Sequence, residues 1–184
     1  MRKGFTPSLR ILVAIIFLVL MVAFCCSLYF RNGSSEAKAL ACEEYSDSEV
    51  GEDYLRIAIS EINSELEAEP KLNKLIFVSL GVRSDTNYVC PTETILRDLR
   101  AANPSRSIRS VSECLVDKFS GFQDRTGERG VLVNIELKES TDSRMIVDFH
   151  AVTGPLGGHS REGIVYERVN GNWVRSFDGT TSIH

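Results

Sequence analysis

The sequence predicts an α+β fold, in which an N-terminal transmembrane helix precedes two helices packed on a curved antiparallel sheet that ends in a four-strand meander. Three observations predict it. Residues 11–30 form an uncharged, largely apolar stretch. Apolar residues recur at three- and four-residue intervals in two segments between residues 46 and 104, as they do in amphipathic helices. From Val131 onward apolar and polar residues largely alternate, which is typical of half-buried strands.

Residues 11–30 are long enough to cross a membrane, since a helix rises about 1.5 Å per residue and the hydrocarbon core is about 30 Å thick. Cleavable signal peptides have a shorter apolar core of about 7–15 residues. The stretch is therefore interpreted as an uncleaved signal-anchor helix. Arg2, Lys3 and Arg10 lie before it, and this basic bias places residues 1–10 in the cytoplasm.

The segments after the anchor are predicted to be a polar linker, residues 31–47, and an exported α+β domain, residues 48–184, in the periplasm or outside the cell. Removal of the N-terminal segment and lipidation of Cys42 stay open as alternatives. From Cys42 onward the chain has 24 acidic and 16 basic residues, a net charge of −8. Nucleic-acid binding needs a basic surface, so we expect no nucleic acid as a partner.

The first helix of the exported domain is predicted to begin in a capping box formed by Ser46 and Glu49 and to end before Pro70. Its apolar stripe is expected to face the core. Its opposite face is expected to be solvated and to carry the acidic residues Glu52, Asp53, Glu61, Glu65 and Glu67. A continuous apolar run from Leu75 to Leu80 follows and predicts a buried strand.

The second helix is predicted between Pro91 and Asn103, because proline favours a first helical turn and the residue before Pro104 disfavours helix. Four arginines lie in and after this helix: Arg97, Arg100, Arg106 and Arg109. They are candidates for a patch that binds an anionic ligand, a lipid headgroup or a partner. Contact with the acidic first helix is the favoured alternative, because that helix supplies carboxylates within the same chain.

The C-terminal third predicts four antiparallel strands in chain order. They are expected at residues 131–138, 145–152, 163–169 and 172–177. The segments between them are rich in turn-forming residues, and Asn170-Gly171 is a strong signal for a two-residue hairpin turn. A meander of this kind needs the two helices to cover one of its faces.

Three cysteines lie beyond the predicted membrane span: Cys42, Cys90 and Cys114. In an oxidising compartment we expect a Cys90–Cys114 disulfide, which by loop entropy would contribute about 3 kcal/mol. The alternative is that both cysteines are reduced and buried. The spacing of cysteines and histidines matches no metal site, and no cofactor is expected.

The candidates for catalysis are Asp148, His150 and His159. Asp148 and His150 are two residues apart on a predicted strand and so share one face. His159 is expected near the start of the next strand, where a carboxylate and imidazoles could exchange protons near neutral pH. The favoured alternative is that they are polar residues on an exposed sheet face, so no catalytic set is predicted.

The predicted elements follow the order helix, strand, helix and meander, and the meander ends in Asn-Gly-Asn-Trp-Val-Arg-Ser-Phe at residues 170–177. This order resembles the cone-shaped fold of nuclear transport factor 2-like proteins, and more loosely that of cystatin-like domains. The resemblance covers residues 46–178. It implies either a small-molecule enzyme or a non-catalytic scaffold, such as the membrane-tethered domains of bacterial envelope assemblies. A fold alone does not decide between these functions.

Three hypotheses for function follow, and the first is favoured. The exported domain is a protein-interaction or scaffold module of the cell envelope, held at the bilayer by residues 11–30. The second hypothesis is a cone fold that binds or converts a small ligand in a pocket at the mouth of the sheet. The third is an inhibitor or immunity-type protein.

Overall fold

The computed structural model describes residues 21, 37–45, 51–69, 75–84, 87–117, 121–154 and 157–183. The predicted membrane span, residues 11–30, lies outside them except for Met21. Within the described ranges no helix combines the length and the hydropathy that crossing a bilayer requires. All described residues from Ala37 onward belong to one unit of the chain.

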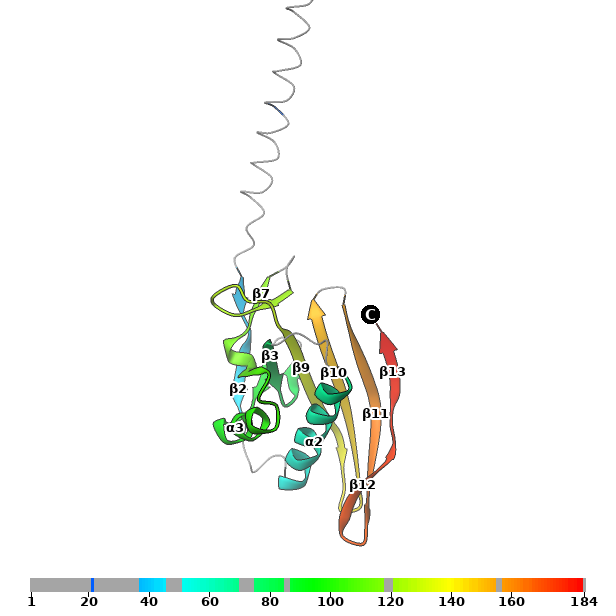
Figure 1. The fold of residues 1–184 in the computed structure, drawn as a ribbon. Coiled ribbons are helices and arrows are strands. Elements are labelled where there is room, and N and C mark those ends of the chain that lie inside the picture. Colours follow the sequence, from blue (N-terminus) through cyan, green and yellow to red (C-terminus); the bar gives the residue numbers. More distant parts are fainter. Residues whose placement is uncertain are drawn as a thin grey trace, which may run out of the picture. The chain divides into compact units, whose positions relative to one another are not determined.

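The central sheet of this unit has seven strands (Figure 1). Six of them follow the order β12-β11-β10-β9-β3-β6, and β13 pairs with β11 beside β12. Their bounds are β3 Leu75–Ser79, β6 Ser107–Ser110, β9 Val131–Ser140, β10 Arg144–Gly154, β11 Gly157–Val169, β12 Asn172–Phe177 and β13 Thr180–Ile183. Strands β9 to β12 are antiparallel neighbours in chain order, which confirms the predicted meander.

The sheet is mostly antiparallel, as predicted, but the pairings of β3 are parallel, which the prediction did not include. Strand β3 pairs in parallel with β6 on one side and with β9 on the other. The chain leaves β3, passes through helix α3 and returns as β6. A crossover of this kind brings the second strand back in the same direction as the first.

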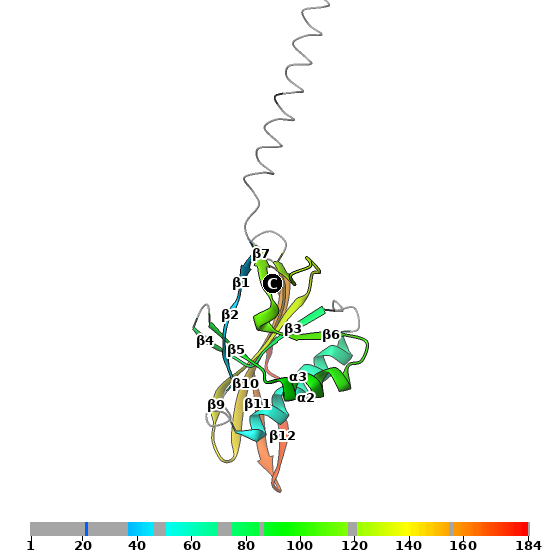
Figure 2. The same ribbon diagram turned by 90° about the vertical axis from the view of Figure 1, so that its left-hand side faces the viewer.

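Two helices cover one face of the sheet, α2 Glu52–Ala68 and α3 Glu93–Ala102 (Figure 2). Both were predicted, although residues 46–50, with the predicted capping box, lie outside the described residues. The Tyr54 hydroxyl fixes α2 across the sheet, because it lies 3.1 Å from the carbonyl oxygen of Leu80 and 2.9 Å from that of Ile135. Burial raises the pKa of Tyr54 far above its ordinary value, so this phenol remains a donor.

The opposite face of β3 is also covered, which explains why every residue of that strand is buried. Its side chains alternate: Ile76 and Val78 pack under the helices, whereas Leu75 and Phe77 pack in a second hydrophobic cluster. Two small sheets lie over that cluster (Figure 2). The first sheet has the order β2-β5-β4, with bounds β2 Ala41–Glu44, β5 Asn87–Cys90 and β4 Val82–Ser84. The second has the order β1-β7-β8, with bounds β1 Lys38–Ala39, β7 Leu115–Asp117 and β8 Gly121–Gln123. A short 3-10 turn, Val111–Glu113, precedes β7.

The cysteines of the domain meet in this second cluster, but not in the predicted pairing. Cys42 is bonded to Cys90, with their Cα atoms 5.6 Å apart, and Cys114 is free and buried. The predicted Cys90–Cys114 bond is therefore wrong. Residues 38–44, predicted as linker, form β1 and β2, and the parallel pairing of β2 with β5 brings Cys42 to Cys90. Burial raises the pKa of the Cys114 thiol to about 12.

Candidate functional site

The structure separates the three residues that the sequence offered for acid–base chemistry. Asp148 and His150 lie on β10 and share the face that points away from α2, between the buried residues of the other face. His159 lies opposite Ala151, whose side chain belongs to the core under α2. Asp148 accepts a hydrogen bond from the backbone N–H of Gly163 at 2.7 Å. His159 therefore faces a different set of residues from Asp148 and His150.

The four arginines proposed as one patch, Arg97, Arg100, Arg106 and Arg109, have separate partners. Arg100 pairs with Glu93 of its own helix at 2.5 Å. Arg106 reaches α2, where it donates to the backbone carbonyls of Leu66 and Glu69, at 2.8 and 3.0 Å. An arginine in this position satisfies carbonyls that the last helical turn leaves free. The contacts described for these arginines are thus made with different groups.

Arg109 lies on β6 and pairs with Asp124, the centre of a tight turn. The Asp124 side chain is 2% exposed and accepts hydrogen bonds from the Thr126 hydroxyl at 2.7 Å and from the N–H groups of Thr126 and Glu128 at 2.8 and 3.0 Å. Arg109 adds an ion pair at 2.9 Å. The hydrogen bond from the Thr126 hydroxyl, with those two N–H groups and the charge of Arg109, lowers the pKa of Asp124 to about 2.

Replacing Asp124 by asparagine is expected to reduce the acid sensitivity of the domain. The pKa of Asp124 lies below that of an unfolded aspartate, about 3.9. Its ionised form therefore contributes stability above about pH 4, and this contribution is lost as the pH falls through about 2. Urea unfolding at several pH values between about 5 and 2 should give a lower free energy of unfolding for Asp124→Asn than for the wild type. This difference should shrink as the pH falls. Asp98→Asn, which removes an exposed ion pair, is the control. A difference in unfolding free energy between wild type and Asp124→Asn that does not change with pH would contradict the expectation.

Two carboxylates of α2 that were predicted to be solvated are instead buried beneath the helix. Glu61 is 0% and Glu65 8% exposed, so for these two residues the prediction of a solvated acidic face is wrong. They continue the series of buried positions that begins with Tyr54 and Ile57. A buried carboxylate is tolerated only when charged or hydrogen-bonding partners compensate for lost water, and β11 and β12 supply those partners.

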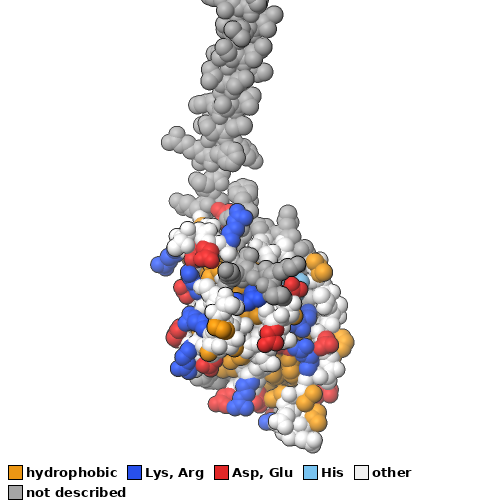
Figure 3. All heavy atoms as spheres, in the orientation of Figure 1, with side chains coloured by type: hydrophobic (Ala, Val, Ile, Leu, Met, Phe, Trp, Pro, Cys, Tyr) orange, Lys and Arg blue, Asp and Glu red, His pale blue; other side chains and the backbone are white. Residues whose placement is uncertain are grey.

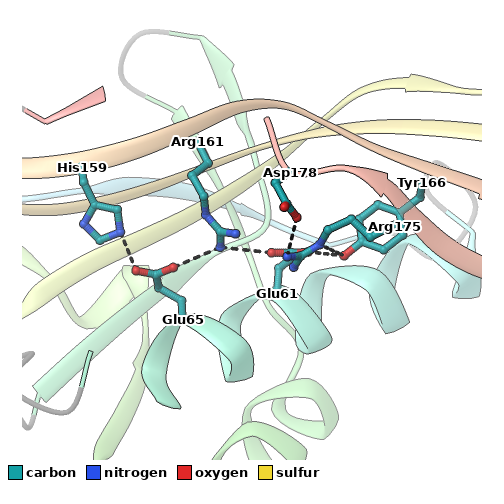
Figure 4. Close-up of polar contacts among 7 residues, drawn as sticks. All are labelled: Glu61, Glu65, His159, Arg161, Tyr166, Arg175 and Asp178. Atoms are coloured by element: carbon teal, nitrogen blue, oxygen red, sulfur yellow. Dashed lines mark hydrogen bonds and ion pairs between the residues drawn. The ribbon is translucent and has the colours of Figure 1, made fainter. Parts of the chain in front are cut away.

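Glu61 and Glu65 are the centre of a continuous polar network (Figure 4). Arg161 joins them, with its Nη2 atom 3.1 Å from Glu61 Oε2 and 3.0 Å from Glu65 Oε2. Glu61 Oε1 accepts hydrogen bonds from the Tyr166 hydroxyl and from Arg175. Glu65 Oε1 lies 2.5 Å from His159 Nε2. At the rim, Arg175 pairs with Asp178 at 3.2 Å.

A β-bulge in β11 brings the residues of this network onto one face. Val147 pairs with Ile164 and Phe149 pairs with Arg161, so two residues of β11, Glu162 and Gly163, oppose one of β10. Gly163 has a φ of 71°, which only glycine adopts readily. The extra residue shifts the alternation of side chains. As a result His159 and Arg161 before the bulge, and Tyr166 after it, all point towards α2.

The electrostatics of the network keep its donors protonated. Burial and the hydrogen bond with Glu61 raise the pKa of Tyr166 to about 12. Burial alone would lower the pKa of Arg175, but its hydrogen bonds with Tyr166 and Glu61 raise it overall. Tyr166 is therefore a hydrogen-bond donor at neutral pH, and the two buried carboxylates face two guanidinium groups.

A pocket of about 540 Å³ opens at the His159 end of the network. It lies between the last turn of α2 and strands β10, β11 and β13. Its walls include Glu65, Glu69, His159, Arg161, Thr181 and Ile183. Within the ranges that the structure describes, no group of three or more His, Cys, Asp or Glu residues could hold a metal ion. The pocket offers a carboxylate–imidazole pair, a guanidinium group and hydroxyls to a ligand.

No family model, curated protein or solved structure matches the chain. The site is therefore inferred from the geometry of its residues. Of its members, His159 alone was a candidate from the sequence, with a different set of neighbours. Glu61 and Glu65 could have been found, because they occur at the three- and four-residue spacing of the buried residues of α2. Arg161 and Arg175 carried no such signal, because their partners are 100 and 114 residues away.

Proposed function

We propose that the chain is a single-span membrane protein whose exported domain is a protein-interaction module of the cell envelope, and that it binds an extended strand of its partner at the edge formed by β12 and β13. The uncharged residues 11–30 support an anchor. A disulfide between Cys42 and Cys90 is consistent with an oxidising compartment such as the periplasm. The element order that resembles nuclear transport factor 2-like scaffolds is compatible with such a role.

The position of the exposed hydrophobic residues carries this proposal. Among the described residues from Ala37 onward, the large hydrophobic side chains that are exposed are Val169, Val174, Phe177 and Ile183, at 49%, 49%, 54% and 85%. All four belong to the last three strands. Hydrophobic side chains gather over the region of β12 at the lower right of Figure 3. Exposed apolar residues that cluster on one part of a surface are typical of an interaction site.

The same strands form an edge of the sheet. Within the part of the chain that the structure describes, β12 and β13 each pair with β11 and with no other strand. An edge strand offers a row of unpaired N–H and C=O groups, and partner proteins bind such edges by adding a strand. Charged residues or prolines usually protect an exposed edge. Strand β13 has neither, and the one charged residue of β12, Arg175, points inward to Glu61.

The test of this proposal is chemical crosslinking in membranes, followed by identification of the captured protein. The double variant Val174→Asp, Phe177→Asp is expected to reduce the yield of the main crosslinked partner by about tenfold or more, because both side chains would otherwise be buried in the interface. Thr94→Asp adds a charge to an exposed position of α3 and should leave the yield unchanged. Circular dichroism checks that the variants are folded. A partner captured equally well by the double variant would refute the proposed edge.

A further inference from the structure

The pocket at the end of α2 offers a second site, which shares strand β13 with the proposed partner edge but lies on the side of the sheet that faces α2. We propose that it binds a small zwitterion of the amino-acid class, with the ligand carboxylate at His159 and Arg161 and the ligand ammonium group at Glu69. Its volume of about 540 Å³ falls within the range of about 300–1,000 Å³ of small-molecule sites.

The buried network beside the pocket is balanced within itself. The carboxylates of Glu61 and Glu65 are matched by the guanidinium groups of Arg161 and Arg175. Around the pocket, the guanidinium group of Arg161 and the imidazole of His159 lie on β11, and the carboxylate of Glu69 lies at the end of α2. They lie on different walls, so a ligand that carries both a negative and a positive group fits better than a simple anion or cation.

The β11 wall has polar groups without a hydrogen-bond partner among the described residues. Arg161 uses Nη2 for both of its ion pairs, and its Nε atom is buried without a partner. His159 uses Nε2 for Glu65, and its other ring nitrogen makes no hydrogen bond to any residue that the structure describes. An unsatisfied buried donor is costly, and a ligand carboxylate would supply acceptors for this wall. The Thr181 hydroxyl, also at the pocket, adds a further donor.

The α2 wall favours a positive group. Glu69 is the C-cap residue of α2, where the helix carries a partial negative charge. Its backbone carbonyl accepts a hydrogen bond from Arg106, but its exposed side chain forms no ion pair within the described ranges. Ala68 and Ile183 add apolar surface at the pocket. The pocket walls therefore complement the carboxylate, the ammonium group and the apolar side chain of an aliphatic amino acid.

The direct test is isothermal titration calorimetry of the full chain in detergent with three probes of similar shape. L-leucine carries both charged groups, 4-methylpentanoate lacks the amine, and 3-methylbutylamine lacks the carboxylate. We expect leucine to bind at least about fivefold more tightly than either analogue, since each lacks one partly exposed ion pair. Absence of leucine binding up to about 10 mM, the range of very weak ligands, would overturn the proposal. Equal binding of all three probes would overturn it as well.

Variants assign the binding to this pocket. Glu69→Gln should weaken leucine about fivefold and leave 4-methylpentanoate unchanged, because it removes only the partner of the ammonium group. Glu67→Gln, at an exposed position two residues earlier, is the matched control. His159→Gln should weaken both carboxylate probes, whereas His150→Gln on the other face of the sheet should not. If His159→Gln fails to fold, Thr181→Val tests the same wall. Leucine binding that is unaffected by Glu69→Gln would refute the site.

Discussion

Replacing Glu61 by alanine is expected to destabilise the domain by about 3–5 kcal/mol, the usual cost of removing one partner from a buried charge network. Glu61 is fully buried and accepts hydrogen bonds from Tyr166, Arg161 and Arg175. Without it, these donors lose their shared acceptor. The free energy of unfolding, measured by denaturant titration of the full chain in detergent, checks the expectation.

Two further variants show whether the loss comes from the network. Glu67→Ala removes an exposed carboxylate from the same helix and should change the unfolding free energy by less than about 0.5 kcal/mol. Glu61→Gln keeps a side-chain oxygen as acceptor but removes the charge, so its effect should lie between the two. A loss below about 1 kcal/mol in Glu61→Ala, comparable to that of an exposed ion pair, would contradict burial of Glu61.

Removing the disulfide is expected to have an effect of similar size. Cys42 and Cys90 are 48 residues apart in the sequence, and by the loop-entropy model a bond that closes such a loop contributes about 4 kcal/mol. Cys42→Ser should lower the unfolding free energy by that amount. A reducing agent should lower the stability of the wild type to the level of the variant and leave Cys42→Ser unchanged.

Peptide mapping under non-reducing conditions is the independent check on the pairing. It should recover a peptide pair joined through Cys42 and Cys90, with Cys114 alkylated only after unfolding. Burial raises the pKa of the Cys114 thiol to about 12, so the reactive thiolate is scarce at neutral pH. Recovery of a Cys90–Cys114 pair would show that the described pairing is wrong.

The meander and both helices could be predicted because their signals are local. Alternation with period two and the Asn170-Gly171 turn define the strands, and Asn170 and Gly171 do adopt the positive φ values of 51° and 83° that such a turn needs. The bulge at Gly163 could not be predicted. It adds one residue to β11 and so changes which side chains face α2. The sequence therefore predicted β11 to begin at Gly163, whereas it begins at Gly157.

The ion network and the disulfide depend on contacts between distant parts of the chain. Nothing near Glu61 indicates that Arg175, 114 residues later, will neutralise it. The partner of Cys90 depends on β2, a four-residue strand in a polar segment with no period. Its parallel pairing with β5 is non-local, and such pairings leave no pattern in the sequence. These two features account for the wrong predictions of a solvated acidic face and a Cys90–Cys114 bond.

The Cys42–Cys90 bond also has a mechanical consequence. A pull on the N-terminal side of the domain can peel β1 from β7, but at Cys42 the force passes through the covalent bond directly to Cys90. The 47 residues between the two cysteines include all of α2 and carry none of this force. At 3.3–3.6 Å per residue, they would add roughly 160–170 Å to the stretched chain. While the bond is oxidised, the helix that carries Glu61 and Glu65 is thus shielded from tension along the chain.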